Sequence, residues 1–439
     1  MIMTKEQLKA AVLQNIEDNR EKLIEIGTNF YNNPETGFQE VKTAKRVQDV
    51  LEECGMSVKC GVALTGVKAT AQGRKHDINV ALMGELDALN MPSHSHCDPA
   101  TGKFHGCGHH AQLTTFLGVA LGLVKSGLNA ELDGDITFIG VPAEEIIEQD
   151  FRKGLRSEGK IGFLSGKQEM IRLGEFDDVD MVMCSHVMGQ NPEAHSWVGH
   201  SWNGVIFKTV RYTGKGAHAG LAPHKGINAL EAALCGMNNM NALRESFLDS
   251  DHVRIHYIFT KGGDSCNIVP DDIRMEVGVR AANMPALRDA NEKVNRALRL
   301  GAEAIGAGIE IVDSGMDLPC HQNETMGEIY LENAKALLGE DKAENVFGDH
   351  RGSSTDCGDV ASLIPLIHPY FSGAVGTPHA NDFDIVDPYA AYVIPSKIAA
   401  MTVIDLLYDD AKLAHKIKDN FVPDFANKEA YLAFANSPQ

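Results

Sequence analysis

The densest group of reactive side chains lies in segment 105–112, HGCGHHAQ, which holds three histidines and one cysteine within six positions. Cys107 and His109 are two residues apart, and Gly106 and Gly108 favour a loop in which both side chains face the same way. A thiolate and an imidazole presented together suit zinc or another borderline metal. The segment therefore indicates a metal site, with a plain polar loop as the alternative.

Two adjacent carboxylates, Glu144 and Glu145, directly follow the strand-like run 135–141. In an open α/β sheet, sites lie outside the carboxyl ends of the strands. Neighbouring carboxylates there can divide the work, since one can bind a metal while the other holds the attacking water as a general base. The alternative is an exposed helix N-terminus, where acidic side chains suit the helix dipole.

Two further histidines fall at predicted strand ends or in adjoining loops. His186 ends the strand-like run 181–187, and His379 follows the turn at 373–376. Each histidine alone is typical of a structural position. Added to the cysteine, histidine and glutamate above, they complete the number of ligands that two metal ions need with a shared bridge and an open water position. The five candidates are Cys107, His109, Glu145, His186 and His379.

Four other residues could support chemistry around such a centre. Asp87 follows the strand 78–84, where it could orient a metal-bound histidine by accepting its ring N–H, or cap a helix. His218 lies in a Gly- and Ala-rich turn and could stabilise an oxyanion. Asn267 and Arg280 together suit a carboxylate, because an amide and a guanidinium both donate hydrogen bonds to it.

The elements that must position these residues alternate in type. Helical periodicity covers 5–30, 40–54 and 111–126. Apolar strand-like runs cover 66–71, 78–84, 135–141 and 181–187. Apolar strands alternating with helices predict an α/β fold, with a mixed, largely parallel sheet covered by helices.

The middle of the chain has a different pattern. Strands at 204–212, 253–260, 273–281 and 307–313 alternate with helices at 226–248 and 286–306. This βαββαβ order is the ferredoxin-like split pattern. We therefore predict that 1–202 and 316–439 form a catalytic domain, interrupted by a smaller α+β domain at 203–315.

Composition excludes several classes of protein. The 439 residues are 44% hydrophobic and 23% charged, which is typical of globular chains. A net charge of −20 argues against nucleic acid or an anionic membrane as a partner. The N-terminal segment lacks the features of a signal peptide, and the longest apolar run, 114–124, is too short to span a bilayer. With the nine cysteines taken as reduced thiols, we expect a cytoplasmic protein.

Several motifs follow one another along almost the whole chain. They are NNPETGFQE (32–40), ELDAL (85–89), HGCGHH, VPAEE, SHV, GKGAHAG, NIVPD, SSTDCGDV and GTPHANDF. In this order they resemble the di-metal amidohydrolases and carboxypeptidases that include hippurate hydrolase, indole-acetyl-amino-acid hydrolase and aminobenzoyl-glutamate hydrolase. The resemblance implies a catalytic domain interrupted by a ferredoxin-like lid domain, through which two subunits form a homodimer.

The resemblance also implies roles for individual residues. It implies that the five candidates above are the metal ligands and that Glu144 is the general base and acid. His218 is similar to the family's lid histidine, which reaches into the partner subunit's site, and Asn267 and Arg280 are similar to its substrate-carboxylate pair. Two divalent ions per subunit are implied; the cysteine and histidine ligands favour zinc, with manganese, cobalt or nickel as alternatives.

Some positions depart from the family pattern. His110 stands where the family commonly has Asp, Gln112 where it often has His, and Tyr31 where it usually has His. The stretch 93–105 is also unusual, and we interpret it as a plain loop rather than an extra metal cluster. Its candidate ligands are His94, His96 and Cys97.

The main prediction is hydrolysis of an amide bond next to a free carboxylate, in an N-acyl, aminobenzoyl or aminoacyl amino acid. One alternative is an exopeptidase for small dipeptides, which would use the same chemistry. The other is a catalytically silent relative that binds metal or a peptide-like ligand.

Overall fold

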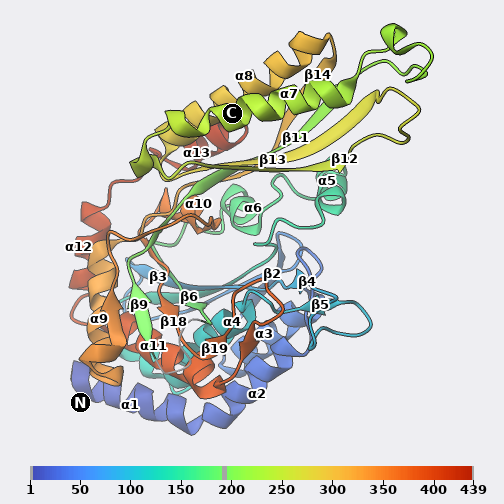
Figure 1. Cartoon of the computed structure of the whole chain (residues 1–439). Helices are drawn as coiled ribbons and strands as arrows, with labels where there is room; N and C mark the ends of the chain where they lie inside the picture. The colour runs from blue at the N-terminus through green and yellow to red at the C-terminus, as the bar shows by residue number, and fades with distance from the viewer. Residues whose placement is uncertain (1–2, 190–194, 438–439) are drawn as a thin grey trace. The chain divides into compact units, whose positions relative to one another are not determined.

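The structure is a computed structural model that describes residues 3–189 and 195–437. The chain forms two units, each built from segments that are distant in sequence (Figure 1). The first unit comprises Met1–His200, His321–Asp349 and Val360–Lys428. The second comprises Ser201–Cys320, His350–Asp359 and Glu429–Gln439.

The second unit is larger than the predicted domain 203–315: it covers 201–320 and also includes the segments 350–359 and 429–439, which we predict in the catalytic domain. Their side-chain contacts explain this. Tyr431 donates a hydrogen bond to Asp359, with 2.7 Å between the oxygens, and the Arg288 guanidinium lies 4.5 Å from the centroid of the Phe434 ring. Neither contact is visible in the local sequence pattern, because the partners are far apart in the chain.

A six-stranded sheet forms the centre of the first unit. β6, β3, β7 and β17 run parallel to one another, and β1 and β2 join antiparallel beside β6. All residues of β3 are buried, as expected for a strand covered on both faces. The predicted mixed, largely parallel sheet is confirmed. In spatial order the strands are β1 (Val58–Val62), β2 (Gly66–Ala71), β6 (Asp135–Val141), β3 (Asn79–Glu85), β7 (Met181–Cys184) and β17 (Leu366–Ile367).

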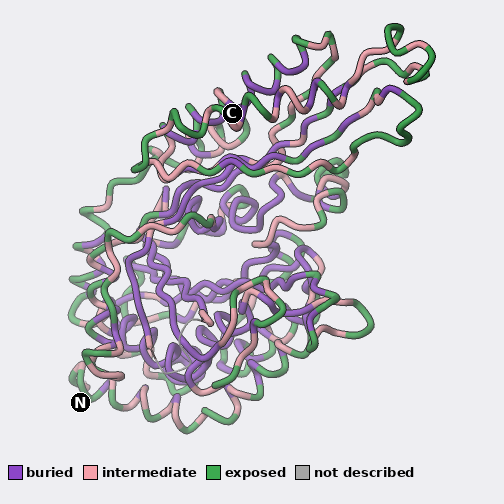
Figure 2. The backbone as a smooth tube through the Cα atoms, viewed as in Figure 1, coloured by how far each residue is buried: buried purple, intermediate pink, exposed green. Residues whose placement is uncertain are grey.

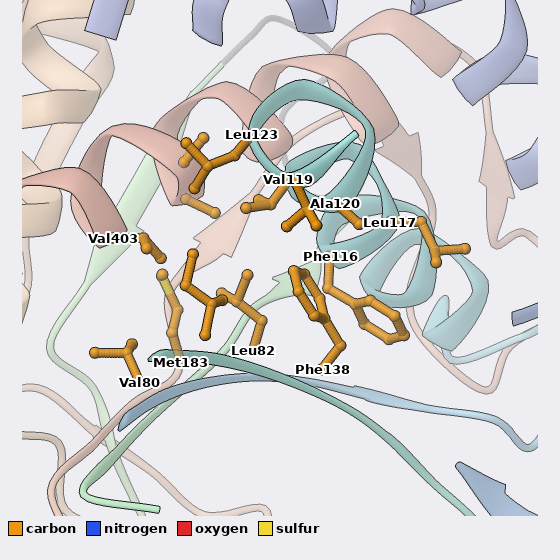
Figure 3. Close-up of a cluster of buried hydrophobic side chains, with 14 of the residues drawn as sticks. Val80, Leu82, Phe116, Leu117, Val119, Ala120, Leu123, Phe138, Met183 and Val403 are labelled. Carbon is orange, nitrogen blue, oxygen red and sulfur yellow. The ribbon is translucent and has the colours of Figure 1, made fainter. Parts of the chain in front are cut away.

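Apolar helices pack against this sheet. Every residue of α4 (His109–Val119) is buried, and the helix continues into the π-helical turn Ala120–Val124. Figure 3 shows Phe116 and Leu123 from this segment packed with sheet residues such as Leu82. The expected helix at 5–30 is two helices that break at Asn19, which ends α1 and precedes α2. The other helices of this layer are α1 (Lys5–Asp18), α2 (Arg20–Tyr31), α3 (Val41–Glu53), α9 (Glu324–Leu338) and α11 (Ile394–Leu407).

The longest apolar helical segment is not the expected 114–124 but Tyr389–Leu407. It is long and apolar enough to cross a membrane, but 94% of that window is buried inside the folded chain. Burial of this kind is typical of the core helix of a globular protein.

The first unit also contains several short strands and helices outside the large sheet. The expected strand at 181–187 is divided at Ser185, because β7 pairs in the large sheet while β8 pairs with β18 in a second sheet. That second sheet has the order β15 (Ala343–Asn345), β9 (Ser196–Val198), β18 (Tyr370–Phe371) and β8 (His186–Val187). Two short pairs are β4 (Leu89–Asn90) with β5 (Lys103–Phe104), and β19 (Ala374–Val375) with β20 (Asp384–Ile385). The remaining helices of the unit are α5 (Gln149–Ser157), α6 (Gly166–Leu173) and α12 (Lys412–Asn420).

The second unit contains the predicted βαββαβ order. Its antiparallel sheet has the strand order β12-β13-β11-β14, and the strands alternate between buried and more exposed residues (Figure 2). The buried set packs with α7 and α8, as the ferredoxin-like pattern requires. The elements are β11 (Gly204–Thr213), α7 (Ala229–Ala242), β12 (Arg254–Lys261), β13 (Asp272–Ala281), α8 (Met284–Ile305) and β14 (Gly308–Asp317). Shorter elements are β10 (Ser201–Trp202), β16 (His350–Arg351) and α10 (Cys357–Ala361), and the last helix is α13 (Lys428–Ala435). Helices α10 and α13 each include residues of both units.

Candidate metal centre

The predicted ligand residues of the first unit lie at the ends of neighbouring elements. β3 and β6 are parallel neighbours, so the residues that follow them emerge at the same edge of the sheet. Asp87 follows β3, and Glu144 and Glu145 follow β6. The loop of His379 is joined to the loop before α4 by a hydrogen bond from its own amide to the Gly106 carbonyl, at 2.9 Å.

The first group of possible ligand atoms comes from Cys107, His109 and His186, which all lie within 4.8 Å of one another. Gly108, at φ 93°, turns the chain between the first two, so that His109 starts a helix rather than lying in a loop. His186 Nδ1 lies 2.7 Å from the Val187 carbonyl oxygen, which can only accept a hydrogen bond. Nδ1 is therefore the donor, and Nε2 keeps a lone pair that can bind a metal. That Nε2 is 3.4 Å from the Cys107 sulfur.

The second group consists of Cys107, Glu145 and His379, again within 4.8 Å. His379 Nε2 lies 2.9 Å from Glu145 Oε1, yet this buried oxygen has no aligned hydrogen-bond donor. Tetrahedral ligands about 2.0–2.3 Å from zinc lie roughly 3.5 Å from one another. Two groups that share one sulfur therefore have the spacing of ligands around two neighbouring ions.

A third group adds Glu85, which the sequence analysis did not select. Its Oε2 lies 3.1 Å from His109 Nε2, and Glu144 Oε2 lies 3.9 Å from the same nitrogen. Glu85 is itself paired with Lys167, at 2.5 Å, and both side chains are buried. Glu85 is the last residue of β3 and stands in the motif ELDAL two residues before Asp87, so its place at the strand end is the signal that could have identified it.

Asp87 lies where it can orient a histidine. His109 Nδ1 is 2.9 Å from the Asp87 carbonyl oxygen and 3.2 Å from its Oδ1, so the aspartate accepts through both backbone and side chain. Its other carboxylate oxygen accepts from the Glu145 amide at 2.9 Å. Fixing Nδ1 as the donor leaves His109 Nε2 facing the carboxylates, the arrangement that orients a metal-binding imidazole.

The electrostatics of this cluster favour a bound cation. Burial raises the pKa of the Cys107 thiol well above its usual value, and Glu145 adds to the shift. Burial alone would lower the pKa of His109, but Cys107 and Glu85 outweigh it and raise that pKa well above its usual value. Burial lowers the pKa of His186 to about 3, which keeps this imidazole neutral. A bound divalent ion would replace the His109 proton in compensating the nearby acidic groups, and the thiol, carboxylate and imidazole donors fit two such ions.

The residues that depart from the family pattern lie beside this cluster. Gln112 accepts from the Glu85 amide at 3.1 Å and donates to Glu85 Oε2 at 2.8 Å, so it supports a carboxylate. His110 is buried with no hydrogen-bond partner on either ring nitrogen, and its ring meets that of Tyr31 edge-on, with 5.4 Å between centroids. Tyr31 donates to Asp384 at 2.6 Å.

The unusual stretch 93–105 forms most of the loop that joins β4 to β5 and includes β5 itself. His94 stacks on Phe104 at a centroid distance of 3.7 Å, and His96 Nδ1 pairs with Asp384 at 3.1 Å. Among the described residues, the groups with metal-ligand spacing do not include His94, His96 or Cys97. These observations agree with a plain loop.

The other predicted site residues belong to the second unit. His218 and Asn267 are exposed, and their segments are joined by a hydrogen bond from the Ala219 amide to the Asn267 carbonyl. His218 Nδ1 accepts from the amides of Gly220 and Leu221, at 3.2 and 3.1 Å, so its Nε2 carries the proton and can donate outward.

Arg280 lies near the end of β13. It donates to Ser354, and its guanidinium lies 5.7 Å from the centroid of the Phe207 ring. Burial lowers the pKa of Arg280.

Residues 81–389 match Peptidase family M20/M25/M40, and the chain belongs to this family. The chain is therefore a metal-dependent amidohydrolase or peptidase, and the class of protein indicated by the motifs is confirmed. The "Xaa-Arg dipeptidase" of Mus musculus is 30% identical over 352 residues, covering 76% of this chain and 72% of that protein.

The chain is also similar to a plant hydrolase in sequence and to a bacterial peptidase in structure. An "IAA-amino acid hydrolase" of Arabidopsis thaliana is 29% identical over 63% of this chain and 59% of that protein. The solved structure of a protein from Bacillus subtilis, described as a dinuclear metal binding peptidase from the M20 family, has a TM-score of 0.66. It covers 89% of this chain and 99% of that chain at 21% identity, which shows a shared fold.

Proposed function

We propose that this enzyme hydrolyses the amide bond of an N-acyl amino acid whose carboxylate is free. The observation that carries the proposal is the pair of ligand groups that share Cys107, with the Glu144 carboxylate 3.9 Å from one of their histidines. In this proposal two divalent ions, with zinc as the preferred metal, are held by five residues: Cys107, His109, Glu145, His186 and His379. Ions bound there would supply Lewis-acid polarisation of the amide carbonyl and would acidify a water molecule.

The protein's own side chains would then carry the protons. Glu144 takes a proton from the attacking water and later delivers one to the leaving nitrogen. Asp87 keeps His109 in one orientation through its two acceptor atoms. His218 donates a hydrogen bond from its Nε2–H to the oxyanion. The two amide hydrogen bonds to Nδ1 support this tautomer.

The free carboxylate of the substrate is assigned to Asn267 and Arg280. An exposed amide and a half-buried guanidinium can each donate to it, and the guanidinium can do so with two parallel hydrogen bonds. Closure of the second unit as a lid would bring these donors to the bond that is cleaved.

Hydrolysis of small dipeptides is the second candidate, favoured by the similarity to the "Xaa-Arg dipeptidase". The reaction would be the same, and the difference would lie in the group on the acyl side. A free amino group there distinguishes a dipeptide from an N-acyl amino acid. Rates for both kinds of substrate at matched concentration separate the two candidates.

The decisive experiment combines metal content with turnover. The purified protein is analysed for metal and assayed with hippurate, aminobenzoyl-glutamate, N-acetyl amino acids and dipeptides, with and without chelator. We expect about two metal equivalents and chelator-sensitive release of an amine. The variant Glu144→Gln should bind metal normally and lose about 10²–10⁴-fold in kcat. Full activity of this variant would remove Glu144 from the mechanism.

We also infer a homodimer through the second unit, in a cytoplasmic enzyme. The two edge strands of its sheet, β12 and β14, expose Ile258 and Val312, and exposed edges of this kind can pair with a second chain. Sedimentation of the full chain tests this, and the variant Ile258→Lys should favour the monomer.

A further inference from the structure

The motif NNPETGFQE at 32–40 has no role in the proposed mechanism, yet its residues contact both carboxylate-bearing loops. The carbonyl oxygen of Glu35 accepts from the Ala88 amide at 2.7 Å, next to Asp87. The Glu40 side chain is fully buried and accepts from the Ala143 amide at 2.8 Å, next to Glu144. The motif therefore braces the loops that follow β3 and β6.

Ala143 has an unusual backbone conformation. Its φ is 54°, in the left-handed region that residues with a Cβ rarely adopt. Such a conformation costs of order 1–3 kcal/mol and persists only where the surroundings enforce it. Because Ala143 directly precedes Glu144, its conformation sets the direction of that carboxylate.

Both backbone polar groups of Ala143, its N–H and its C=O, are hydrogen-bonded. The amide is bound by Glu40, whose other oxygen accepts from the Thr65 hydroxyl at 2.5 Å. The carbonyl accepts from Arg152 Nη1 and from the Gly166 amide, each at 3.2 Å.

Arg152 lies on α5, and its side chain is fully buried. Besides the Ala143 carbonyl, it donates to the carbonyls of Leu164 (2.7 Å) and Glu145. Gly37 makes room for this, because a Cβ there would lie 2.3 Å from Arg152 Nη2 and 2.8 Å from the Ala143 Cα. The guanidinium thus joins three points of the chain around the two glutamates.

We propose that Glu40 and Arg152 are positioning residues that hold the turn 143–145 in the conformation that aims Glu144 at the attacking water. They act through backbone groups and touch neither substrate nor reacting atoms. The inference rests on the proposed function only for the role of Glu144. A displacement of about 1 Å at a reacting group can cost 10²-fold in rate, so loss of either brace affects kcat.

The charge of Arg152 supports this role. Burial lowers the pKa of Arg152, and the carboxylates of Asp87, Glu40, Glu144 and Glu145 oppose that shift. The guanidinium is therefore a buried cation whose charge is favoured by the acidic groups around the turn.

The test compares variants that remove each brace with variants that conserve it. Glu40→Leu and Arg152→Met should lower kcat by about 10²-fold with KM unchanged, because they disturb the turn that aims Glu144. Glu40→Gln should restore most of kcat, since its amide oxygen still accepts from Ala143 and its NH2 group can donate to Thr65. Arg152→Lys keeps the charge but cannot reach three carbonyls, so it should stay impaired. Arg156→Met, an exposed arginine on the same helix, is the control with unchanged activity.

A second measurement does not depend on turnover. Amide hydrogen exchange of a peptide covering 138–150 is followed in the metal-free and metal-loaded forms of each variant. Glu40→Leu and Arg152→Met should exchange faster there, while Glu40→Gln and Arg156→Met match the wild type. If Glu40→Leu does not fold, Thr65→Val removes only the hydroxyl that supports Glu40, and a smaller change of the same sign is expected.

The outcomes separate the two proposals. Wild-type kcat and exchange in Glu40→Leu and Arg152→Met would overturn the positioning role. A Glu40→Gln variant as impaired as Glu40→Leu would also overturn it, because the conserved acceptor would then not matter. A wild-type enzyme that cleaves no substrate would refute the proposed function, while the exchange data would still test the brace.

Discussion

The candidate metal site of the first unit and the candidate substrate residues of the second unit are held in different ways. His109 and Asp87 are at most 1% exposed, and side chains from several elements fix them and their neighbours. His218 and Asn267 are exposed, and the contacts that fix them run largely through the local backbone. His109 and Asp87 are built into the core, whereas His218 and Asn267 lie on loops.

This difference indicates which step each region serves. A group that must hold an ion or aim a base works best on a rigid scaffold with supporting side chains. Groups on exposed loops can adjust when a ligand arrives, and loops held by rigid scaffolds commonly carry binding residues. We therefore expect that changes to the metal ligands and buried ion pairs of the first unit affect metal binding or stability, while changes to the exposed residue His218 affect turnover alone.

The largest effect is expected for Cys107, because its sulfur belongs to both ligand groups. Cys107→Ala should remove metal from both positions and reduce turnover to background. Metal analysis and a hydrolysis assay after reconstitution with zinc measure this. As the control, Cys60→Ala changes an exposed thiol and should leave both quantities unchanged. Two metal equivalents in Cys107→Ala would show that this sulfur is not a ligand.

The buried ion pair between Lys167 and Glu85 gives the next largest effect. Lys167→Met leaves the Glu85 carboxylate buried without its counter-charge, which costs roughly 3–5 kcal/mol in the free energy of unfolding. Lys160→Met breaks an ion pair in which both side chains are more than half exposed, so it should cost less than about 1 kcal/mol. Urea unfolding of the metal-free protein compares the two. Equal losses would mean that burial of the Glu85 pair does not matter.

A change at His218 in the second unit should lower turnover without affecting metal binding or stability. His218→Ala should lower kcat by about 10²–10³-fold, the effect of losing one oxyanion donor. Metal content and melting temperature should not change, because His218 is exposed and its ring accepts only from neighbouring amides. His224→Ala alters another exposed histidine nearby and should keep wild-type kcat. A loss of metal in His218→Ala would contradict the expectation that this residue affects turnover and not metal binding.

Much of the fold was predictable because it depends on local patterns. Buried strands such as β3 are continuous apolar runs, and the βαββαβ order of the second unit follows from alternating periodicities. The ligand candidates were found for the same reason, since Glu145 directly follows a strand and Cys107 lies in a Gly-rich loop. Their roles stay predictions until metal is measured.

The supporting residues could not be predicted, because their function depends on partners far away in the chain. Arg152 reads as one more charged residue on a short helix, and Lys167 as a surface lysine, yet both are fully buried. Glu40 is 103 residues from the amide it accepts from. Charged residues of this kind are normally exposed, so local patterns assign them to the surface.

The last comparison concerns pH and sharpens the contrast between buried and exposed acids. Burial raises the pKa of Glu40 from 4.5 to about 8, and Asp87 adds to the shift. Between these values the folded chain keeps a proton that the unfolded chain has lost, so this group lowers stability as pH rises. Glu40→Gln removes that dependence. The free energy of unfolding of the metal-free wild type should therefore fall relative to Glu40→Gln as pH rises from 5 to 8.

Glu17 provides the control of opposite sign in the same unit. Hydrogen bonds from Lys397 and Tyr389 lower its pKa from 4.5 to about 2, so it adds stability above pH 4.5 that is lost as pH falls toward 2. Because Glu17 is partly exposed, the contribution is about 1 kcal/mol. Glu17→Gln should thus be less stable than the wild type at pH 7 and equal to it near pH 2. Urea titrations across the range measure both variants, and parallel curves for Glu40→Gln and the wild type would show that buried Glu40 ionises normally.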